Sequence, residues 1–319
     1  MTVVALDSDS IKWLKSRFKH NVKFGEPMSK HTSLRVGGPA EALVTPENVE
    51  DLKTLVKWSW DRGLSYLIIG KGTNLLVKDN GIHGITIALT KCLKRIDRTD
   101  RNTDRVIVTA MAGVNLKTLC AYALKQGLEG MNFALGIPGT VGGGIIMNAG
   151  TAHGSMENVL ESINVLLPTG HTCRIKKEAL DFDYRKLSWR PELTDGYRNQ
   201  TVILDGRFCL CPSDPEALKK TAREILKTRK QRQPIGLPSA GCFFKNPASG
   251  ETAGKLIEMA GLKGKSVGDA QISLKHANFF INRHNASAAD FLTLMDLVQK
   301  VVLEKFNVHL EGEVKIVGA

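Results

Sequence analysis

The feature that most constrains this chain is a glycine-rich segment at residues 136–150, which reads GIPGTVGGGIIMNAG. Glycine has no Cβ, so such a backbone can pass close to a flat or charged ligand and adopt positive φ without strain. Exposed N–H groups in a loop of this kind suit phosphate oxygens. A flexible linker would be rich in Gly and Ser, whereas this segment also carries Ile137, Val141 and Ile145. We therefore predict a buried cofactor loop rather than a linker.

Length and charge set the broad class. The 319 residues allow two or three domains, and 42% hydrophobic with 24% charged residues is ordinary for a globular protein. The net charge of +12 favours anionic partners such as nucleic acid, acidic lipid or phosphorylated small molecules. No apolar run approaches the roughly 20 residues that cross a bilayer, and no secretory signal opens the chain. We expect a cytoplasmic protein without a membrane span.

The cysteines and histidines show no metal-binding pattern. The six cysteines are scattered and none forms C-x-x-C, which disfavours structural zinc and a disulfide framework. His153, His276 and His284 lack ligand spacing. We expect reduced thiols and no metal.

Apolar periodicity and turn residues predict a mixture of helices and strands. The expected helices lie at 11–18, 46–63, 115–126, 215–233, 252–260 and 287–306. The expected strands lie at 42–44, 66–69, 75–77, 105–111, 163–167, 172–175, 201–204, 278–281 and 308–317, with a mixed polar and aromatic segment at 181–186.

For three features, the residues alone do not decide between a ligand-binding role and a plain structural role. The turn at 70–74 is either a phosphate-cradling loop or a plain hairpin, and it matches neither G-x-G-x-x-G nor G-x-x-x-x-G-K-[ST]. Arg35, just before Gly37-Gly38, either meets a ligand phosphate or is a solvated turn cation. The basic helix at 215–233 lacks interleaved aromatics, which favours a solvated face over a nucleic-acid site.

Taken together, the ordered motifs resemble one family. They are GKGTN at 70–74, the glycine loop, Tyr184-Arg185, SAGCFFKNP at 239–247 and LEGEV at 310–314. From residue 32 to 318 the chain resembles the UDP-N-acetylenolpyruvoylglucosamine reductases, flavoenzymes of peptidoglycan precursor synthesis. The interval between Tyr184-Arg185 and the 239–247 motif resembles the shorter type, which lacks an extra tyrosine loop.

The resemblance implies an α+β fold in which two lobes hold FAD in the vanillyl-alcohol-oxidase (PCMH) manner, with a smaller α+β substrate-binding domain. The implied boundaries are FAD-binding lobes at 1–95 and 96–212, the substrate domain at 213–307, and a C-terminal strand at 308–319. The implied partners are UDP-N-acetylglucosamine enolpyruvate and NADPH, with non-covalent FAD, no nucleic acid and a monomeric state.

The resemblance also assigns binding residues. The implied FAD contacts are Arg35, Gly70, Lys71, Gly72, Thr73, Asn74, Leu75, Gly113, Gly136, Ile137, Pro138, Gly139, Thr140, Gly143, Asn148, Ala149 and Gly150. The implied substrate contacts are Tyr184, Lys245, Asn246, Lys275, His276 and Asn278.

The implied reaction reduces an enol ether with NADPH through FAD, and it needs a cation at the substrate carboxylate and a proton donor over the adjacent carbon. Arg185 is the expected cation, since its planar fork grips carboxylates, although a surface salt bridge is the plain alternative. Glu313 would add a hydrogen bond if burial raised its pKa, or else be a surface carboxylate.

Cys242 departs from the family, which commonly has serine as the proton donor here. An ordinary thiol, with a pKa of about 8.5, is mostly protonated at neutral pH and is more acidic than a hydroxyl, so the role is preserved. The alternative is a buried structural cysteine, but Gly241, Lys245 and Asn246 indicate a polar turn.

Two rival functions remain. Another flavin oxidase or dehydrogenase of the same superfamily would fit the glycine loop, and His153 could then attach the flavin covalently. A basic nucleic-acid or nucleotide-sugar binding protein rests only on the charge of +12 and the 215–233 helix.

Overall fold

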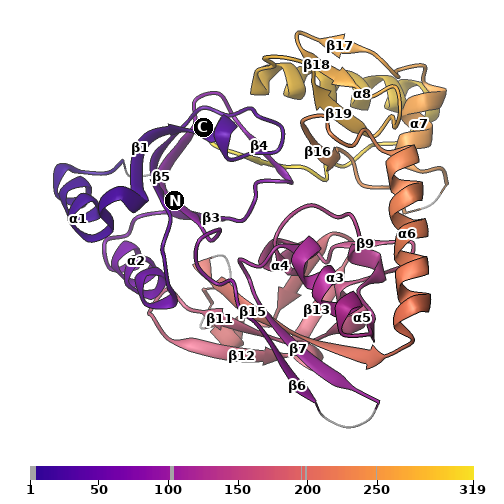
Figure 1. The fold of residues 1–319 in the computed structure, drawn as a ribbon. Helices are drawn as coiled ribbons and strands as arrows, with labels where there is room; N and C mark the ends of the chain where they lie inside the picture. Colours follow the sequence, from indigo (N-terminus) through magenta and orange to yellow (C-terminus); the bar gives the residue numbers. More distant parts are fainter. Residues whose placement is uncertain (1–4, 101–103, 195, 198–199, 249) are drawn as a thin grey trace. The chain divides into compact units, whose positions relative to one another are not determined.

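The structure, a computed structural model, describes residues 5–100, 104–194, 196–197, 200–248 and 250–319 (Figure 1). It mixes helices and antiparallel and parallel strands. The chain divides into two compact units. Unit 1 comprises Met1–Lys23, Leu43–Gly70 and Gly84–Lys227, and unit 2 comprises Phe24–Ala42, Lys71–His83 and Thr228–Ala319.

The described helices have these bounds: α1 Ser8–Phe18, α2 Val49–Asp61, α3 Leu116–Lys125, α4 Val141–Ile146, α5 Met156–Val159, α6 Pro215–Arg232, α7 Ala253–Met259 and α8 Ala288–Phe306. The described strands are β1 Val22–Pro27, β2 Pro39–Val44, β3 Tyr66–Ile69, β4 Leu75–Val77, β5 Ile82–Ala88, β6 Ile96–Asp100, β7 Val106–Met111, β8 Leu128–Glu129, β9 Gly150–Thr151, β10 Gly154–Ser155, β11 Leu160–Leu166, β12 Thr172–Lys176, β13 Leu180–Asp183, β14 Lys186–Trp189, β15 Val202–Pro212, β16 Ser239–Cys242, β17 Ser266–Val267, β18 Ala270–Ile272, β19 Phe279–Asn282 and β20 Lys315–Val317.

Unit 1 is built on an antiparallel sheet of order β12-β11-β15-β7-β6, with β8 also pairing with β15. Helices α4 and α5 pack against β15, and Figure 1 shows α3, α4 and α5 together on one face of this sheet. The central strand β15 alternates buried Gly206, Phe208 and Leu210 with half-buried Asp205 and Arg207. One face of the sheet is therefore apolar and helix-covered, as an antiparallel sheet with a single buried face requires. A second sheet has the order β1-β2-β5-β3, with β3 and β5 parallel.

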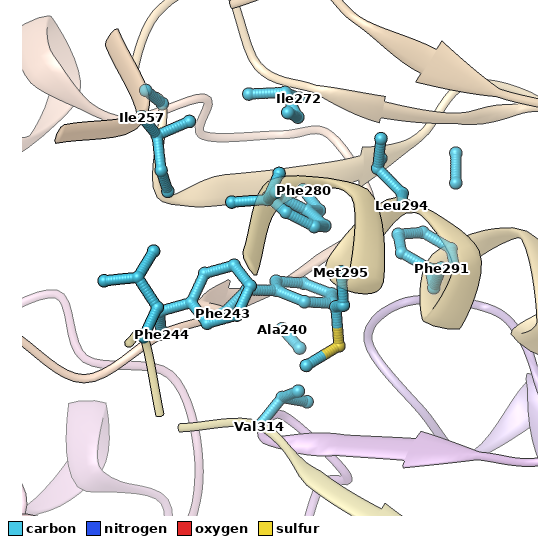
Figure 2. Packing of buried hydrophobic residues seen from close by; sticks show 14 of the residues in the cluster. Ala240, Phe243, Phe244, Ile257, Ile272, Phe280, Phe291, Leu294, Met295 and Val314 are labelled. Atoms are coloured by element: carbon cyan, nitrogen blue, oxygen red, sulfur yellow. The ribbon is translucent and has the colours of Figure 1, made fainter. Parts of the chain in front are cut away.

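Unit 2 contains the antiparallel sheet β16-β19-β18-β17 and the parallel pair β4-β20. Its core gathers buried side chains of β16, β19, α7 and α8 (Figure 2). Phe243 stacks on Phe280 and Phe291, at ring-centroid distances of 4.3 and 5.6 Å. Helix α8 starts with a capping box of Ser287 and Asp290, and Asp79 accepts two further backbone N–H groups there. The aromatic core thus includes Phe243 and Phe244, which directly follow residue 242.

Most predicted elements are confirmed within a few residues, and three predictions are wrong in detail. The 201–204 strand extends to Pro212. The 181–186 segment, for which no helix or strand was predicted, contains the end of β13 and the start of β14. The glycine segment contains helix α4. The predicted final strand at 308–317 is regular only at Lys315–Val317, because residues 308–314 make irregular contacts with 243–245 instead of a ladder.

Candidate active site

In unit 1 the glycine segment turns into a helix because its cap and its packing favour one. Thr140 caps α4 by accepting from the Gly143 N–H at 3.4 Å. A Cβ on Gly142 would lie 2.9 Å from Ala112 Cβ, and one on Gly144 would lie 2.7 Å from Met156 Cε. These two glycines serve close packing. Gly143 is exposed, and a Cβ there would be in ordinary contact with Thr140 Oγ1, at 3.6 Å, so close packing does not explain this glycine.

Two other predicted cofactor residues of unit 1, Gly70 and Gly113, are closely packed. A Cβ on Gly70 would lie 2.3 Å from Thr140 Oγ1, which places the end of β3 directly against the glycine segment. Gly113 is buried, with the carbonyl oxygens of Leu89 and Cys92 2.4 Å from where its Cβ would be. Close packing therefore explains why both positions are glycine, and their contact with a cofactor stays a prediction.

The pair Tyr184-Arg185 forms the two-residue turn of hairpin β13-β14 and is joined to the glycine segment. Arg185 has φ of 58°, a left-handed conformation that is uncommon outside glycine and asparagine. Its Nη2 donates to the Gly150 carbonyl at 3.2 Å, and its guanidinium lies 4.8 Å from the Tyr184 ring centroid. Non-glycine residues in such conformations cluster at functional sites. This geometry holds the guanidinium at the end of the glycine segment.

In unit 2 the structure brings Cys242, Glu313 and Asn74 onto neighbouring segments. The Glu313 N–H donates to the Phe243 carbonyl at 2.8 Å, and Asn74 Nδ2 donates to the Glu313 carbonyl at 3.2 Å. Gly241, with φ of 82°, lies in a register shift of the β16-β19 pair between Ser239 and Cys242. Such bulges re-aim a side chain and are common beside active sites. Cys242 and Glu313 are both half-buried.

The segment around Arg35 belongs to the same part of unit 2. Ser33 donates its backbone N–H to the Gly72 carbonyl at 3.1 Å and its hydroxyl to the Ser239 carbonyl at 2.6 Å. Arg35 and Lys71 are exposed, and Arg35 has φ of 57°. The alternative of a plain hairpin at 70–74 is excluded, since β3 pairs with β5 and β4 pairs with β20. The turn instead links strands of two parallel pairs, and its contact with a cofactor stays a prediction.

The predicted substrate residues of the 239–247 motif and the following loop have structural partners of their own. Lys245 forms an ion pair with Glu311 at 2.5 Å, and Asn246 Oδ1 accepts from the Ala253 N–H at 3.1 Å. Lys275 Nζ donates to the Lys230 carbonyl near the end of α6 at 2.6 Å. Substrate binding by these three residues stays a prediction. To bind substrate, each side chain would have to share or give up the hydrogen bond or ion pair that it makes here.

His276 and Asn278 are tied into the same unit. Burial lowers the pKa of His276, and its Nδ1 accepts from the Asn278 N–H at 3.3 Å. Asn278 is 2% exposed, and its side chain accepts from the Phe244 N–H at 2.9 Å and donates to the Phe244 carbonyl at 2.8 Å. Both ends of this amide hold the backbone two residues after Cys242. We therefore assign Asn278 a positioning role, and its substrate contact stays a prediction.

Sequence reasoning missed Arg229. It lies on α6 among exposed Lys and Arg residues, so the charge pattern predicted only a solvated face. Burial lowers the pKa of Arg229, and its interaction with Cys242 opposes this shift. The two side chains are therefore electrostatic neighbours. The one signal in the sequence was the position of Arg229, which shares the helix face of the buried Ala222 and Ile225.

The residues present fit a flavin dinucleotide. In unit 1 the glycine segment has exposed backbone at residues 136 and 143, where the missing Cβ atoms allow a ligand to approach closely. In unit 2 Arg35 and Lys71 offer exposed cations. No group of three or more metal-ligating side chains occurs among the residues described. In the same part of the chain, no helix has the length and apolar character needed to cross a membrane.

Comparison with known proteins agrees with this chemistry. The FAD binding domain family matches residues 40–176, which with the mixed architecture defines an α+β flavoprotein and confirms the predicted fold class. The family described as UDP-N-acetylenolpyruvoylglucosamine reductase, C-terminal domain, matches residues 233–317. The chain belongs to the UDP-N-acetylenolpyruvoylglucosamine reductase family.

Individual relatives cover nearly the whole chain. The UDP-N-acetylenolpyruvoylglucosamine reductase of Desulfosudis oleivorans is 46% identical over 98% of this chain and 100% of its own. That of Clostridium botulinum strain 657 is 42% identical over 94% of this chain and 93% of its own. The crystal structure of the reductase (MurB) from Thermus caldophilus matches with a TM-score of 0.75 at 35% identity, covering 93% of this chain and 99% of that one.

Proposed function

We propose that this protein reduces the enolpyruvyl group of UDP-N-acetylenolpyruvoylglucosamine with NADPH, giving UDP-N-acetylmuramate for peptidoglycan synthesis. The observation that carries the proposal is the family relationship over nearly the whole chain, which includes both the FAD-binding region and the C-terminal region. We also propose that it acts as a monomer in the cytoplasm, as the sequence analysis expected. FAD, when bound, supplies the two-electron carrier between NADPH and the substrate double bond.

The chain's own residues handle the substrate's charge. Reduction of the double bond places negative charge on the substrate carboxylate, and Arg185 is the proposed cation for it. Its anchor on the Gly150 carbonyl supports this role, because a side chain already held in place loses less freedom when it binds. Glu313, in protonated form, would donate a second hydrogen bond to the same carboxylate.

The remaining step is proton transfer to carbon. Cys242 is the proposed donor, since a thiol gives up a proton more readily than the serine hydroxyl that it replaces. The bulge at Gly241 and the clamp of Asn278 on Phe244 support the role because they fix the backbone around it. Arg229 would stabilise the thiolate that remains after the proton has left.

An anaerobic two-stage experiment tests the proposal. NADPH should bleach the bound flavin, and the enolpyruvyl nucleotide sugar added afterwards should restore the oxidised spectrum. Alkylation confirmed at Cys242 should block the second stage and spare the first. Failure of the unmodified protein to recolour contradicts the function, and recolouring of the alkylated protein contradicts the role of Cys242. A denatured sample that releases its FAD argues against attachment at His153.

A further inference from the structure

Asn148 joins the glycine segment to the hairpin that carries Arg185. Its Nδ2 donates to the carbonyl of Asp183, the last residue of β13, at 3.2 Å. Its Oδ1 accepts from the Glu157 N–H, at the start of α5, at 3.1 Å. The side chain is 7% exposed, so these bonds are shielded from water. Sequence reasoning placed Asn148 among the cofactor contacts, but the structure uses both ends of its amide inside the protein.

The backbone of Asn148 explains why this residue type stands here. Its φ is 39°, in the left-handed region that asparagine tolerates better than most side chains. Asparagine combines that conformation with a donor and an acceptor, whereas glycine has no side chain and aspartate has no donor. The position therefore needs both its backbone shape and its amide.

The two links between these segments restrain Arg185 from both sides. The Asn148 amide holds the carbonyl just before the Tyr184-Arg185 turn, and the Arg185 guanidinium holds the Gly150 carbonyl just after Asn148. A two-residue turn with a left-handed arginine is strained and needs such support to persist. Loss of the first link would let the turn move relative to residue 150.

We propose that Asn148 is a positioning residue for the substrate-binding guanidinium of Arg185, rather than a contact to the cofactor. This inference rests on the proposed function for its catalytic consequence. Asn148 supports only the half-reaction that needs Arg185, in which the enolpyruvyl substrate is reduced. Binding of FAD and reduction by NADPH do not depend on it.

The substitution Asn148→Asp isolates the link. It preserves size, tolerance of positive φ and the acceptor for the Glu157 N–H, and it replaces the donor to Asp183 by an oxygen that repels that carbonyl. Asn158→Asp is the matched control: it is the same change in the same unit, at an exposed residue whose hydrogen bonds with Ser155 need only its acceptor oxygen. The holoenzyme variants are compared by stopped-flow spectroscopy in each half-reaction, with the FAD dissociation constant measured separately.

In Asn148→Asp we expect reoxidation by the enolpyruvyl substrate to slow by about 10- to 100-fold, because a small displacement of a positioning group costs that much. Flavin reduction and FAD affinity should stay within about twofold of the unaltered protein. Asn158→Asp should match the unaltered protein in all three. If Asn148→Asp weakens FAD binding and slows both half-reactions, the inference is overturned in favour of a cofactor contact. If it lowers the Tm but leaves both half-reactions unchanged, the inference is overturned in favour of a purely structural role.

A stability cycle gives a second readout that needs no substrate. Asn148→Asp, Arg185→Gln and the double variant are unfolded thermally without ligand, and non-additive shifts in Tm are expected because both side chains bridge the same two segments. Additive shifts would contradict the coupling. If the unaltered protein is not reoxidised by the substrate, the proposed function fails, while this cycle still decides whether Asn148 supports Arg185.

Discussion

Cys242 differs in its surroundings from the buried cysteines Cys92 and Cys120. Burial raises the pKa of Cys92 to about 11 and that of Cys120 to about 12, which keeps both thiols protonated and unreactive. Cys242 is half-buried at a bulge and has the guanidinium of Arg229 as an electrostatic neighbour. A nearby cation favours the thiolate. Cys242 should therefore be more reactive than Cys92 and Cys120.

Arg229→Gln tests that neighbour. Removing the guanidinium disfavours the thiolate, so alkylation of Cys242 by iodoacetamide near neutral pH should slow by about threefold or more. The rate is measured on the Cys242 peptide by mass spectrometry, with Cys92 and Cys120 as slow internal references. Arg232→Gln, an exposed change on the same helix, should leave the rate unaltered. Equal rates in the two variants would remove Arg229 from the site.

His276 gives unit 2 a dependence on pH. Burial lowers its pKa in the folded state, with Lys263 acting in the same direction, while the unfolded chain has a pKa near 6.5. The unfolded state therefore binds the proton more readily, and stability falls as the pH falls through about 6.5. His276→Gln should lose less stability than the unaltered protein between pH of about 7.5 and 5.5, measured by urea unfolding. The exposed His309→Gln is the control, and equal losses in both variants would contradict the prediction.

At the scale of elements, Asn278 connects β19 to the segment that follows Cys242. Asn278→Ala would leave the buried N–H and carbonyl of Phe244 without these partners, and each such group costs about 1–3 kcal/mol. We expect the free energy of unfolding to drop by about 2–4 kcal/mol in urea. Asn285→Ala, at an exposed residue of the same unit, should cost under about 0.5 kcal/mol. A loss of substrate affinity without a loss of stability would instead favour the substrate contact predicted from the sequence.

Elements with strong local signals could be predicted from the sequence. Helix α8 combines a capping box with an apolar face, and α2 begins at the cap Asn48, so their starts were found within a few residues. Helix α4 could not be found, because three consecutive glycines oppose helix formation and only packing against Ala112 and Met156 overrides them. The hairpin β13-β14 was missed because its turn contains Tyr184-Arg185 rather than the usual Asn-Gly.

At the scale of the whole molecule, each compact unit is made of segments that are separated in the sequence. Strands β1, β2 and β5 each begin in one compact unit and end in the other. The chain therefore passes between the two units within single strands. Cys242 and Glu313 are also far apart in sequence, and the Glu313 N–H donates to the carbonyl of Phe243, the residue after Cys242. Periodicity contains no information on such pairings. The motifs could therefore be found from the sequence, but their neighbours required the structure.

Net charge makes a prediction that belongs to the molecule as a whole. With +12 on the chain and two anionic substrates, long-range attraction should raise the encounter rate, and salt screens it over about 10 Å at 0.1 M. We expect kcat/KM for NADPH and for the nucleotide sugar to fall severalfold between about 0.02 and 0.3 M NaCl, while kcat changes little. Charge reversal at the exposed residues Lys219, Lys220 and Arg223 of α6 should flatten this slope without changing kcat at high salt. An unaltered slope would mean that the attraction arises close to the site, from cations such as Arg35 and Lys71, and that the basic face of α6 is only solvated.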